Sequence, residues 1–264
     1  MAAAARVIPA AGRSALSTTW RVRLLRIALV AGVLAAWQAL SMSGLLFRDV
    51  VPSLAAIGRA LGTLLGNPDF YANLGVTLYE IGAALAIGGV AGLVAGVALG
   101  ANRFLSQAYE ALVYYLGPTP KIIFFPVMIM WFGVGSGSKI AMGVLSCFFP
   151  IVISTAAGMR EVDAVLIRVG RSFRLSAWQM ATKVYLPALR QPIVNGVRLG
   201  LGVAIIGTLL AETKLSNKGI GYLIIQAYST FDMPKMYALL IVLFVLSIGA
   251  NAAIGRLARD RIGS

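Results

Sequence analysis

Histidine is absent from the 264-residue sequence, and cysteine occurs only once, as Cys147. A single cysteine excludes internal disulfides and Cys-x-x-Cys redox motifs, and without histidine a zinc site is nearly excluded. A Ser-His-Asp or Cys-His catalytic centre is impossible from this chain alone. Cys147 lies in an uncharged run, where a small buried apolar side chain is its simplest role. The sequence therefore lacks the residues that most metal and nucleophilic chemistry requires.

Charge is also scarce, since Asp, Glu, Lys and Arg make up 12% of the chain while 59% of its residues are hydrophobic. This composition excludes an intrinsically disordered chain and argues against a water-soluble enzyme. Runs free of Asp, Glu, Lys and Arg cover 27–47, 81–102, 122–138, 140–159, 199–211 and 236–255. Several approach the ~20 residues that a helix needs to cross a bilayer. The sequence predicts an all-α, polytopic membrane protein.

The net charge of +14 is unevenly distributed. Fifteen of the 23 basic residues fall within 1–26, at Arg103, within 160–190 and within 256–261. These are alternate loops of a six-span chain, so the excess follows the positive-inside rule. We therefore expect both termini in the cytoplasm. Nothing in the pattern indicates nucleic-acid binding, which would need a soluble basic module.

Six transmembrane helices are expected within a single membrane domain, residues 24–258. This domain follows a basic cytoplasmic arm, 1–23, and precedes a cytoplasmic tail, 259–264. The first span is read as an uncleaved helix rather than a signal peptide because its apolar run is long and further spans follow. The expected spans are 27–47, 73–99, 107–133, 139–158, 188–211 and 236–255, the fifth of them ended by Glu212.

Two short apolar segments are expected outside the hydrocarbon core. Residues 50–69 contain a helix with Ser53 at its N-cap, stopped by Asn67-Pro68-Asp69, and it is too short to span. We place it at the outer interface. The apolar piece Gly219–Ser229 within the outer connection 213–235 is too short as well.

Small residues recur at helical spacing in the second and fifth expected spans. Such stripes let two transmembrane backbones approach closely, so we expect helix packing there. The residues are Gly88, Gly92, Gly96, Gly100, Gly196 and Gly200.

The third expected span is interrupted by Pro118, Pro120 and Pro126. Broken backbone at membrane depth is tolerated where protein or a wet cavity satisfies the freed carbonyls. Lys121 lies in this region, which Trp131 helps to close. Candidate residues of a translocation path are Pro120, Lys121, Pro126, Trp131 and Glu212.

The role of these charged residues remains open. A Lys121–Glu212 ion pair would be merely structural, whereas a path lysine would favour anions. Glu80 and Glu110 lie near expected span ends, where their side chains can reach the interface.

The loop 159–187 contains an apolar stripe of Val162, Leu166, Val169 and Phe173 at helical spacing. Arg168, Arg171 and Arg174 lie on other faces. Two interpretations fit this pattern. The helix lies on the inner leaflet with its arginines facing lipid phosphates, or its stripe docks in a groove of a cytoplasmic partner.

No G-x-x-x-x-G-K-[ST] motif occurs in the chain, so it does not bind nucleotide through a P-loop. If ATP drives transport, another polypeptide must hydrolyse it.

The loop resembles the EAA loop of permease subunits of bacterial ABC importers. Arg168-Val169-Gly170 occupy the E-A-A positions and Arg174 that of the motif's glycine. Val184, Leu186 and Pro187 then match I-x-L-P. Residues 120–141, 148–155 and 211–224 look like the nitrate, sulfonate and taurine branch, and the resemblance covers about 50–260.

This resemblance implies a type I ABC importer permease, with loop 160–187 as the helix that couples it to the ATPase. Two ATP-binding subunits, a second permease copy in a homodimer and an extracytoplasmic solute-binding protein are the implied partners. This chain needs no cofactor, since ATP and Mg²⁺ bind the ATPase. Implied coupling residues are Val162, Leu166, Arg168, Val169, Gly170, Arg171, Phe173, Arg174, Leu186 and Pro187.

Arginine replaces both the acidic residue and the glycine of the motif, which leaves open the charges that this helix meets on its partner. An ion-driven carrier or channel working without ATP is the alternative function. A membrane-embedded enzyme is a third hypothesis, which the absence of histidine and the scarcity of intramembrane acids argue against.

Overall fold

A computed structural model describes residues 15–44 and 50–260, and every regular element within them is helical. Much of the expected N-terminal arm, residues 1–14, and most of the expected tail, residues 261–264, lie outside this part. The chain forms two compact units, Met1–Ile57 and Gly58–Ser264.

The first unit contains helix α1, Ala15–Met42, which begins inside the expected arm rather than after it. Most of its large apolar side chains from Trp20 onward are exposed, as suits a lipid-facing span. The Trp37 indole N–H donates to Pro52 O at 3.0 Å, and the Leu54 N–H donates to Gln38 Oε1 at 3.1 Å. These bonds tie the start of α2, Leu54–Leu65, to α1.

Both ends of α2 follow the expected signals. Ser53 Oγ accepts the Ala56 N–H at 3.3 Å, which confirms the N-cap. The helix ends before Asn67, whose side chain accepts the Asp69 N–H at 2.9 Å and so begins α3, Pro68–Ala101. One polar triplet therefore both stops α2 and starts the next helix.

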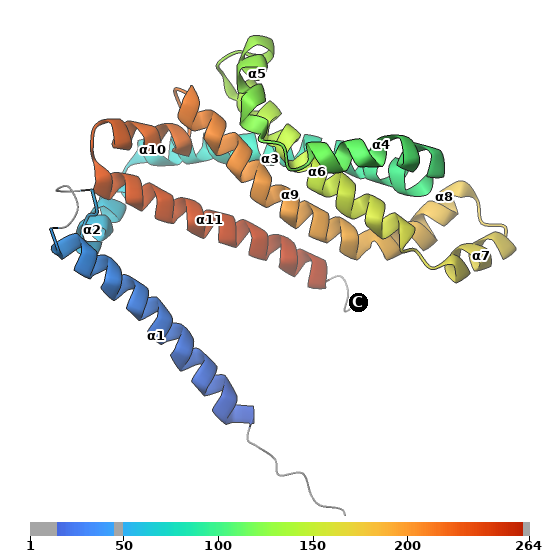
Figure 1. Cartoon of the computed structure of the whole chain (residues 1–264), viewed down its shortest axis with the longest axis horizontal. Coiled ribbons are helices and arrows are strands. Elements are labelled where there is room, and N and C mark those ends of the chain that lie inside the picture. The colour runs from blue at the N-terminus through green and yellow to red at the C-terminus, as the bar shows by residue number, and fades with distance from the viewer. Residues whose placement is uncertain (1–14, 45–49, 261–264) are drawn as a thin grey trace, which may run out of the picture. The chain divides into compact units, whose positions relative to one another are not determined.

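The core of the second unit consists of α3, α6 (Ser136–Arg160) and α9 (Leu186–Lys214), with α6 packed against both others (Figure 1). The glycine stripe of α3 faces α6 at very short range. A Cβ on Gly88 would lie 2.4 Å from Cys147 Sγ, and one on Gly96 would lie 2.6 Å from Thr155 Cβ. Gly92 and Gly100 meet Ile151 and Met159 of α6 in the same way, and Gly196 and Gly200 of α9 meet Ser154 and Ile151.

The third expected span is two helices joined by a sharp bend. Helix α4, Arg103–Leu116, is followed by the 3₁₀ turn η1, Lys121–Phe124, and by α5, Phe125–Phe132, at 94° to α4. In Figure 1, α5 projects away from α9 while α4 lies along α6. Phe125 fixes the base of α5 by packing with Met142 and Ala211. The bend coincides with Pro118 and Pro120, as the sequence predicts.

The remaining elements are α7 (Ala164–Ser172), α8 (Ala177–Met180), the π-helical turn η2 (Ala181–Tyr185), α10 (Ile220–Ser229) and α11 (Met233–Asp260). Within the described residues, five helices are long and apolar enough to cross a membrane, and the bent pair would be a sixth. The fifth span begins earlier than expected, because helix continues from Ala177 through η2 into α9. It also continues past Glu212 to Lys214.

Candidate functional site

Helix α7 is delimited by local hydrogen bonds that the sequence provides. Asp163 is its N-cap, with Oδ1 accepting the Val165 N–H at 2.7 Å. At its end, the Leu175 N–H donates to Gly170 O at 3.1 Å and the Arg174 N–H donates to Arg171 O at 2.9 Å. These two bonds form a Schellman motif, which satisfies the last carbonyls of the helix.

Arg174 occupies the position of this motif that normally requires glycine. Its φ is +53°, in the left-handed region that a side chain enters at a cost of about 1 kcal/mol or more. This is the residue that aligns with the glycine of the EAA motif. The backbone therefore keeps the turn that a glycine would favour, although an arginine is present.

The segment after α7 folds back on it. Ser176 and Gln179 form a capping box. The Gln179 N–H donates to Ser176 Oγ at 3.3 Å, and the Ser176 N–H donates to Gln179 Oε1 at 2.9 Å. Gly170 is buried, and a Cβ there would lie 2.5 Å from Met180 Sδ. Contact between α7 and the turn that leads to α9 thus fixes α7 to a membrane-spanning helix.

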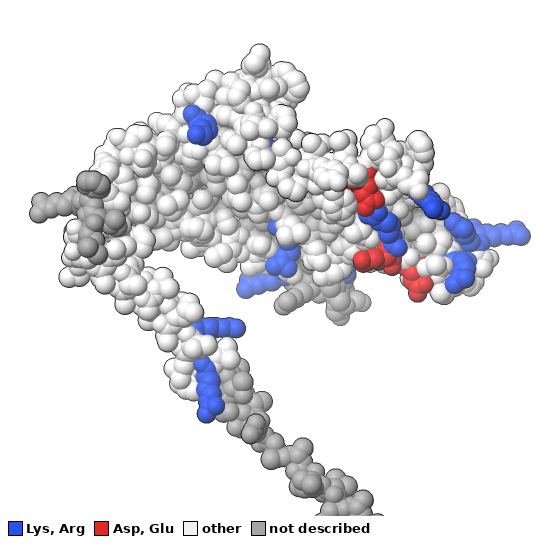
Figure 2. Space-filling model, viewed as in Figure 1, with Lys and Arg blue, Asp and Glu red and all other residues white. Residues whose placement is uncertain are grey.

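Most of the proposed coupling residues are accessible. Leu166, Val169 and Phe173 are 49%, 46% and 77% exposed. Arg168, Arg171, Arg174, Leu186 and Pro187 are exposed as well. In Figure 2, Lys and Arg side chains gather at the end of the unit where α7 and α8 lie.

Val162 does not belong to the exposed stripe. It precedes the N-cap of α7 and is 8% exposed, so it packs inside the protein. The +4 spacing from Val162 to Leu166 looked helical, but Asp163 interrupts the helix between them by capping it.

At the broken span, Lys121 donates to two backbone carbonyls at the bend. Its ammonium group donates to Gly117 O at 2.5 Å and to Thr119 O at 3.4 Å, and it lies 5.2 Å from the Phe149 ring centroid. Pro120 and Lys121 line a cavity of about 270 Å³ with Ser146 and residues of α9. Lys121 is therefore half-buried at the wall of a cavity.

The other candidate path residues are not gathered there. Pro126 and Trp131 are exposed on α5, and Glu212 is fully buried in a different place. Within residues 50–260, Lys121 forms no ion pair with Glu212 or with any other carboxylate. The Lys121–Glu212 pair considered from the sequence is absent.

Glu212 instead joins α9 to α3 and to the start of α10. Thr77 Oγ1 donates to Glu212 Oε1 at 2.7 Å, and the Gly221 N–H donates to Oε2 at 2.6 Å. Thr77 Oγ1 also accepts the Ile220 N–H at 2.8 Å. The carboxylate thus lies at the N-terminus of α10, where a negative group is favoured. Gly219, at φ +106°, leaves it room, since a Cβ there would lie 2.5 Å from Glu212 Cδ.

Two further charged residues belong to this buried polar cluster, and of these the sequence analysis did not single out Lys139. Glu80 and Lys139 are 1% and 0% exposed, and the Lys139 ammonium donates to Val134 O. Glu80 does not reach the interface, which corrects the expectation for it. Glu110 does lie near a surface and pairs with Arg160 at 2.5 Å. One signal for Lys139 was present in the sequence, since it is the single charged residue between the uncharged runs 122–138 and 140–159.

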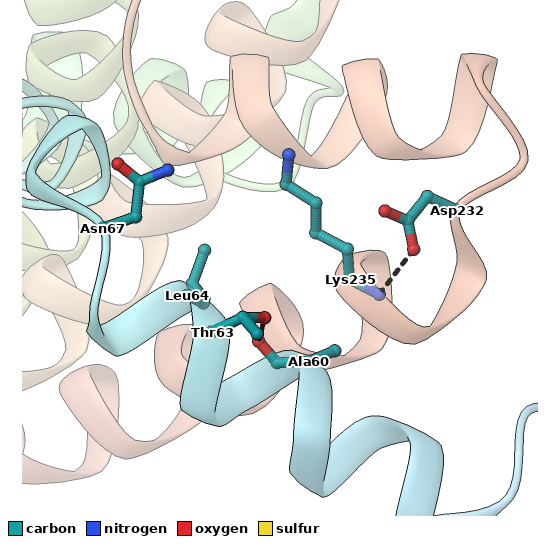
Figure 3. Close-up of a pocket in the computed structure, with 6 residues that line it drawn as sticks. All are labelled: Ala60, Thr63, Leu64, Asn67, Asp232 and Lys235. Carbon is teal, nitrogen blue, oxygen red and sulfur yellow. Dashed lines mark hydrogen bonds between the residues drawn. The ribbon is translucent and has the colours of Figure 1, made fainter.

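A second hollow, about 330 Å³, lies between the end of α2 and the start of α11 (Figure 3). It is lined by Ala60, Thr63, Leu64, Asn67, Asp232 and Lys235. Asn67 caps α3, and Asp232 caps α11 by accepting the Lys235 N–H at 3.2 Å. Its polar groups therefore serve largely to cap helices.

Comparison with known proteins identifies the class of transporter. The model of the family described as "binding-protein-dependent transport system inner membrane component" matches residues 88–262. The chain belongs to this family. It is thus a permease component of an ABC importer rather than an enzyme, which confirms the family expected from the sequence.

Several curated permeases align with most of this chain. It is 31% identical over 218 residues to the putative aliphatic sulfonates transport permease protein SsuC of Bacillus subtilis, covering 83% of this permease and 79% of that one. It is 28% identical to the taurine transport system permease protein TauC of Escherichia coli, covering 88% of each. It is also 31% identical to the riboflavin transport system permease protein RibX of Chloroflexus aurantiacus, covering 88% and 76%.

A solved structure supports the fold of the permease. An inward-facing conformation of the MetNI methionine ABC transporter matches 72% of this chain and 94% of its own, with a TM-score of 0.61 at 22% identity. The expected type I importer architecture is confirmed.

Proposed function

We propose that this permease forms the translocation path of an ATP-driven importer for a small anionic or zwitterionic organic solute of the sulfonate and taurine class. Two separate ATP-binding subunits, which hold ATP and Mg²⁺, power it. A solute-binding protein delivers the solute from outside the inner membrane. Family membership and the names of two relatives support this proposal.

The exposed stripe of α7 is the observation that carries the coupling role. Leu166, Val169 and Phe173 are accessible on a helix anchored to α9 through η2. An apolar helix face of this kind gains free energy when it enters a groove. Movement of a docked α7 would pass directly into a membrane-spanning helix, as alternating access driven by an ATPase requires.

The solute class rests on Lys121. Its ammonium group lines the cavity beside α9 and has no carboxylate partner in the described residues. A cation at membrane depth is costly and favours anions that pass it. A sulfonate group presents such a negative charge, and so does taurine.

We place two copies of the permease in the complex, because α5 exposes Met130 and Trp131 at 83% and 71% beside an apolar hollow.

Both termini and the α7 segment lie in the cytoplasm, and α2 and α10 lie at the outer side. The distribution of arginine supports this orientation.

Co-purification and reconstitution test the proposal together. The tagged permease is expected to retain a stoichiometric ATP-binding subunit. Proteoliposomes with the binding protein outside should take up taurine or methanesulfonate only with ATP inside. Val169→Asp should abolish uptake and leave the permease inserted, because an unpartnered carboxylate would face an apolar groove. Uptake driven by an ion gradient without an ATP-binding subunit would refute the proposal, and riboflavin uptake alone would refute the solute class.

A further inference from the structure

We infer that the ATP-binding partner of this permease receives α7 in a groove with acidic walls, whose carboxylates pair with Arg168, Arg171 and Arg174. This inference rests on the proposed coupling role of α7 and adds the chemistry of the partner surface. Such a groove makes the partner specific for this permease, since a groove lined with basic residues would repel α7.

The three arginines are available for pairing. Each is exposed, and in residues 50–260 none of the three forms an ion pair within the chain. The nearby acids are largely engaged elsewhere, since Asp163 caps α7 and Glu110 pairs with Arg160. The guanidinium donors of α7 are therefore left for another molecule.

Docking of the apolar stripe would bring these charges close to the partner. Arg168 directly precedes Val169, and Arg174 directly follows Phe173, so both lie next to the stripe in sequence but on other faces, and a groove deep enough to enclose α7 reaches both arginines. Burial of a guanidinium that loses water without gaining a partner is strongly unfavourable. Only negatively charged hydrogen-bond acceptors compensate that cost well, and carboxylates match the guanidinium fork in bidentate geometry.

The position of Arg171 favours a protein groove over a lipid surface. It lies two residues from both Val169 and Phe173, and residues two apart in a helix point to different faces. If the stripe were lying on the bilayer, Arg171 would point away from the phosphates. A groove with walls on both sides of α7 can reach it.

Binding measurements on charge-neutralised variants test the inference. The purified permease, in neutral detergent without added lipid, is titrated with its co-purifying ATP-binding subunit from about 50 mM to about 500 mM NaCl. We expect Arg168→Gln/Arg171→Gln/Arg174→Gln to bind about 10-fold or more weakly at low salt and to lose most of the salt dependence of the wild type. The matching triple lysine variant should retain most of both. Arg103→Gln, exposed at the start of α4, is the control and should bind as the wild type.

The remaining outcomes are equally specific. Wild-type binding by the triple glutamine variant in detergent would overturn the inference. If the triple glutamine variant lost the attachment to phosphatidylglycerol vesicles that the wild type shows, while its binding to the subunit was unchanged, the arginines would be assigned to lipid instead. In either case, loss of binding in Val169→Asp would leave the proposed coupling function standing. If Val169→Asp also bound normally, the coupling role of α7 itself would be wrong.

Discussion

Lys121 has a structural role other than the ion pair considered from the sequence. It satisfies carbonyl groups at the bend and also lines the cavity beside α9. Structural use of the ammonium group as a donor does not require its charge, because a neutral amide could donate to Gly117 O as well. A substitution at Lys121 can therefore remove the charge and keep a hydrogen-bond donor.

Lys121→Gln is expected to leave a folded, assembled complex and to lower taurine uptake about 10-fold, since one charge near a passing anion is worth about 1–2 kcal/mol. Uptake by proteoliposomes and the amount of assembled complex are measured together. Lys121→Arg, which retains the charge, is the control. Because Lys121 and Glu212 are not paired, adding Glu212→Gln should not rescue the variant. Normal uptake by Lys121→Gln would remove the charge from the mechanism.

Thr77 is the residue on which the buried polar cluster most depends, because its hydroxyl both donates to Glu212 and accepts the Ile220 N–H. Thr77→Val keeps the shape but leaves a buried carboxylate and a backbone donor short of partners. We expect a loss of about 2 kcal/mol or more in stability, measured by thermal unfolding of the purified permease. Thr77→Ser should be close to the wild type. Equal stability of the valine and serine variants would show that these bonds are not formed.

At the scale of elements, the contact between α3 and α6 depends on the absence of side chains along one stripe. A methyl group on Gly96 would lie 2.6 Å from Thr155 Cβ and 2.8 Å from Val152 O. Gly96→Ala should therefore separate the helices and cost about 1–3 kcal/mol in thermal stability. Gly82→Ala on the same helix meets nothing within 4 Å and serves as the matched control. An unchanged Gly96→Ala variant would contradict the close packing.

The spans and the short helices were predictable, because long uncharged runs and caps such as Ser53 act locally. The bend at Pro118 and Pro120 was predictable for the same reason. The buried cluster was not, because Glu80, Lys139 and Glu212 lie far apart in the chain and meet only when α3, α6 and α9 pack together.

In the coupling segment, the stripe and the arginines could be read from spacing, but two features could not. The burial of Val162 depends on where Asp163 caps α7, and spacing alone does not show which acid is a cap. The left-handed conformation of Arg174 is hidden because the usual glycine is missing. Only the resemblance marked that position.

For the whole molecule, the orientation proposed from the distribution of arginines is open to direct labelling. In a Cys147→Ala background, Arg171→Cys should react with an impermeant maleimide only after the cells are opened. Lys218→Cys, exposed in the connection before α10, should react in intact cells. Labelling of position 171 in intact cells would show that α7 lies outside the cytoplasm and would contradict the proposed topology.

The central claim is that α7 docks on an ATP-binding subunit, and a photo-crosslinker at position 173 tests it most directly. Phe173 is 77% exposed at the end of α7, and Phe244, 66% exposed within α11, is the matched control. With benzoylphenylalanine at position 173, illumination of cells should yield a covalent adduct to an ATP-binding subunit, identified by mass spectrometry. The same group at position 244 should give none. Adducts of position 173 to lipid alone, or equal adducts from both positions, would contradict the account.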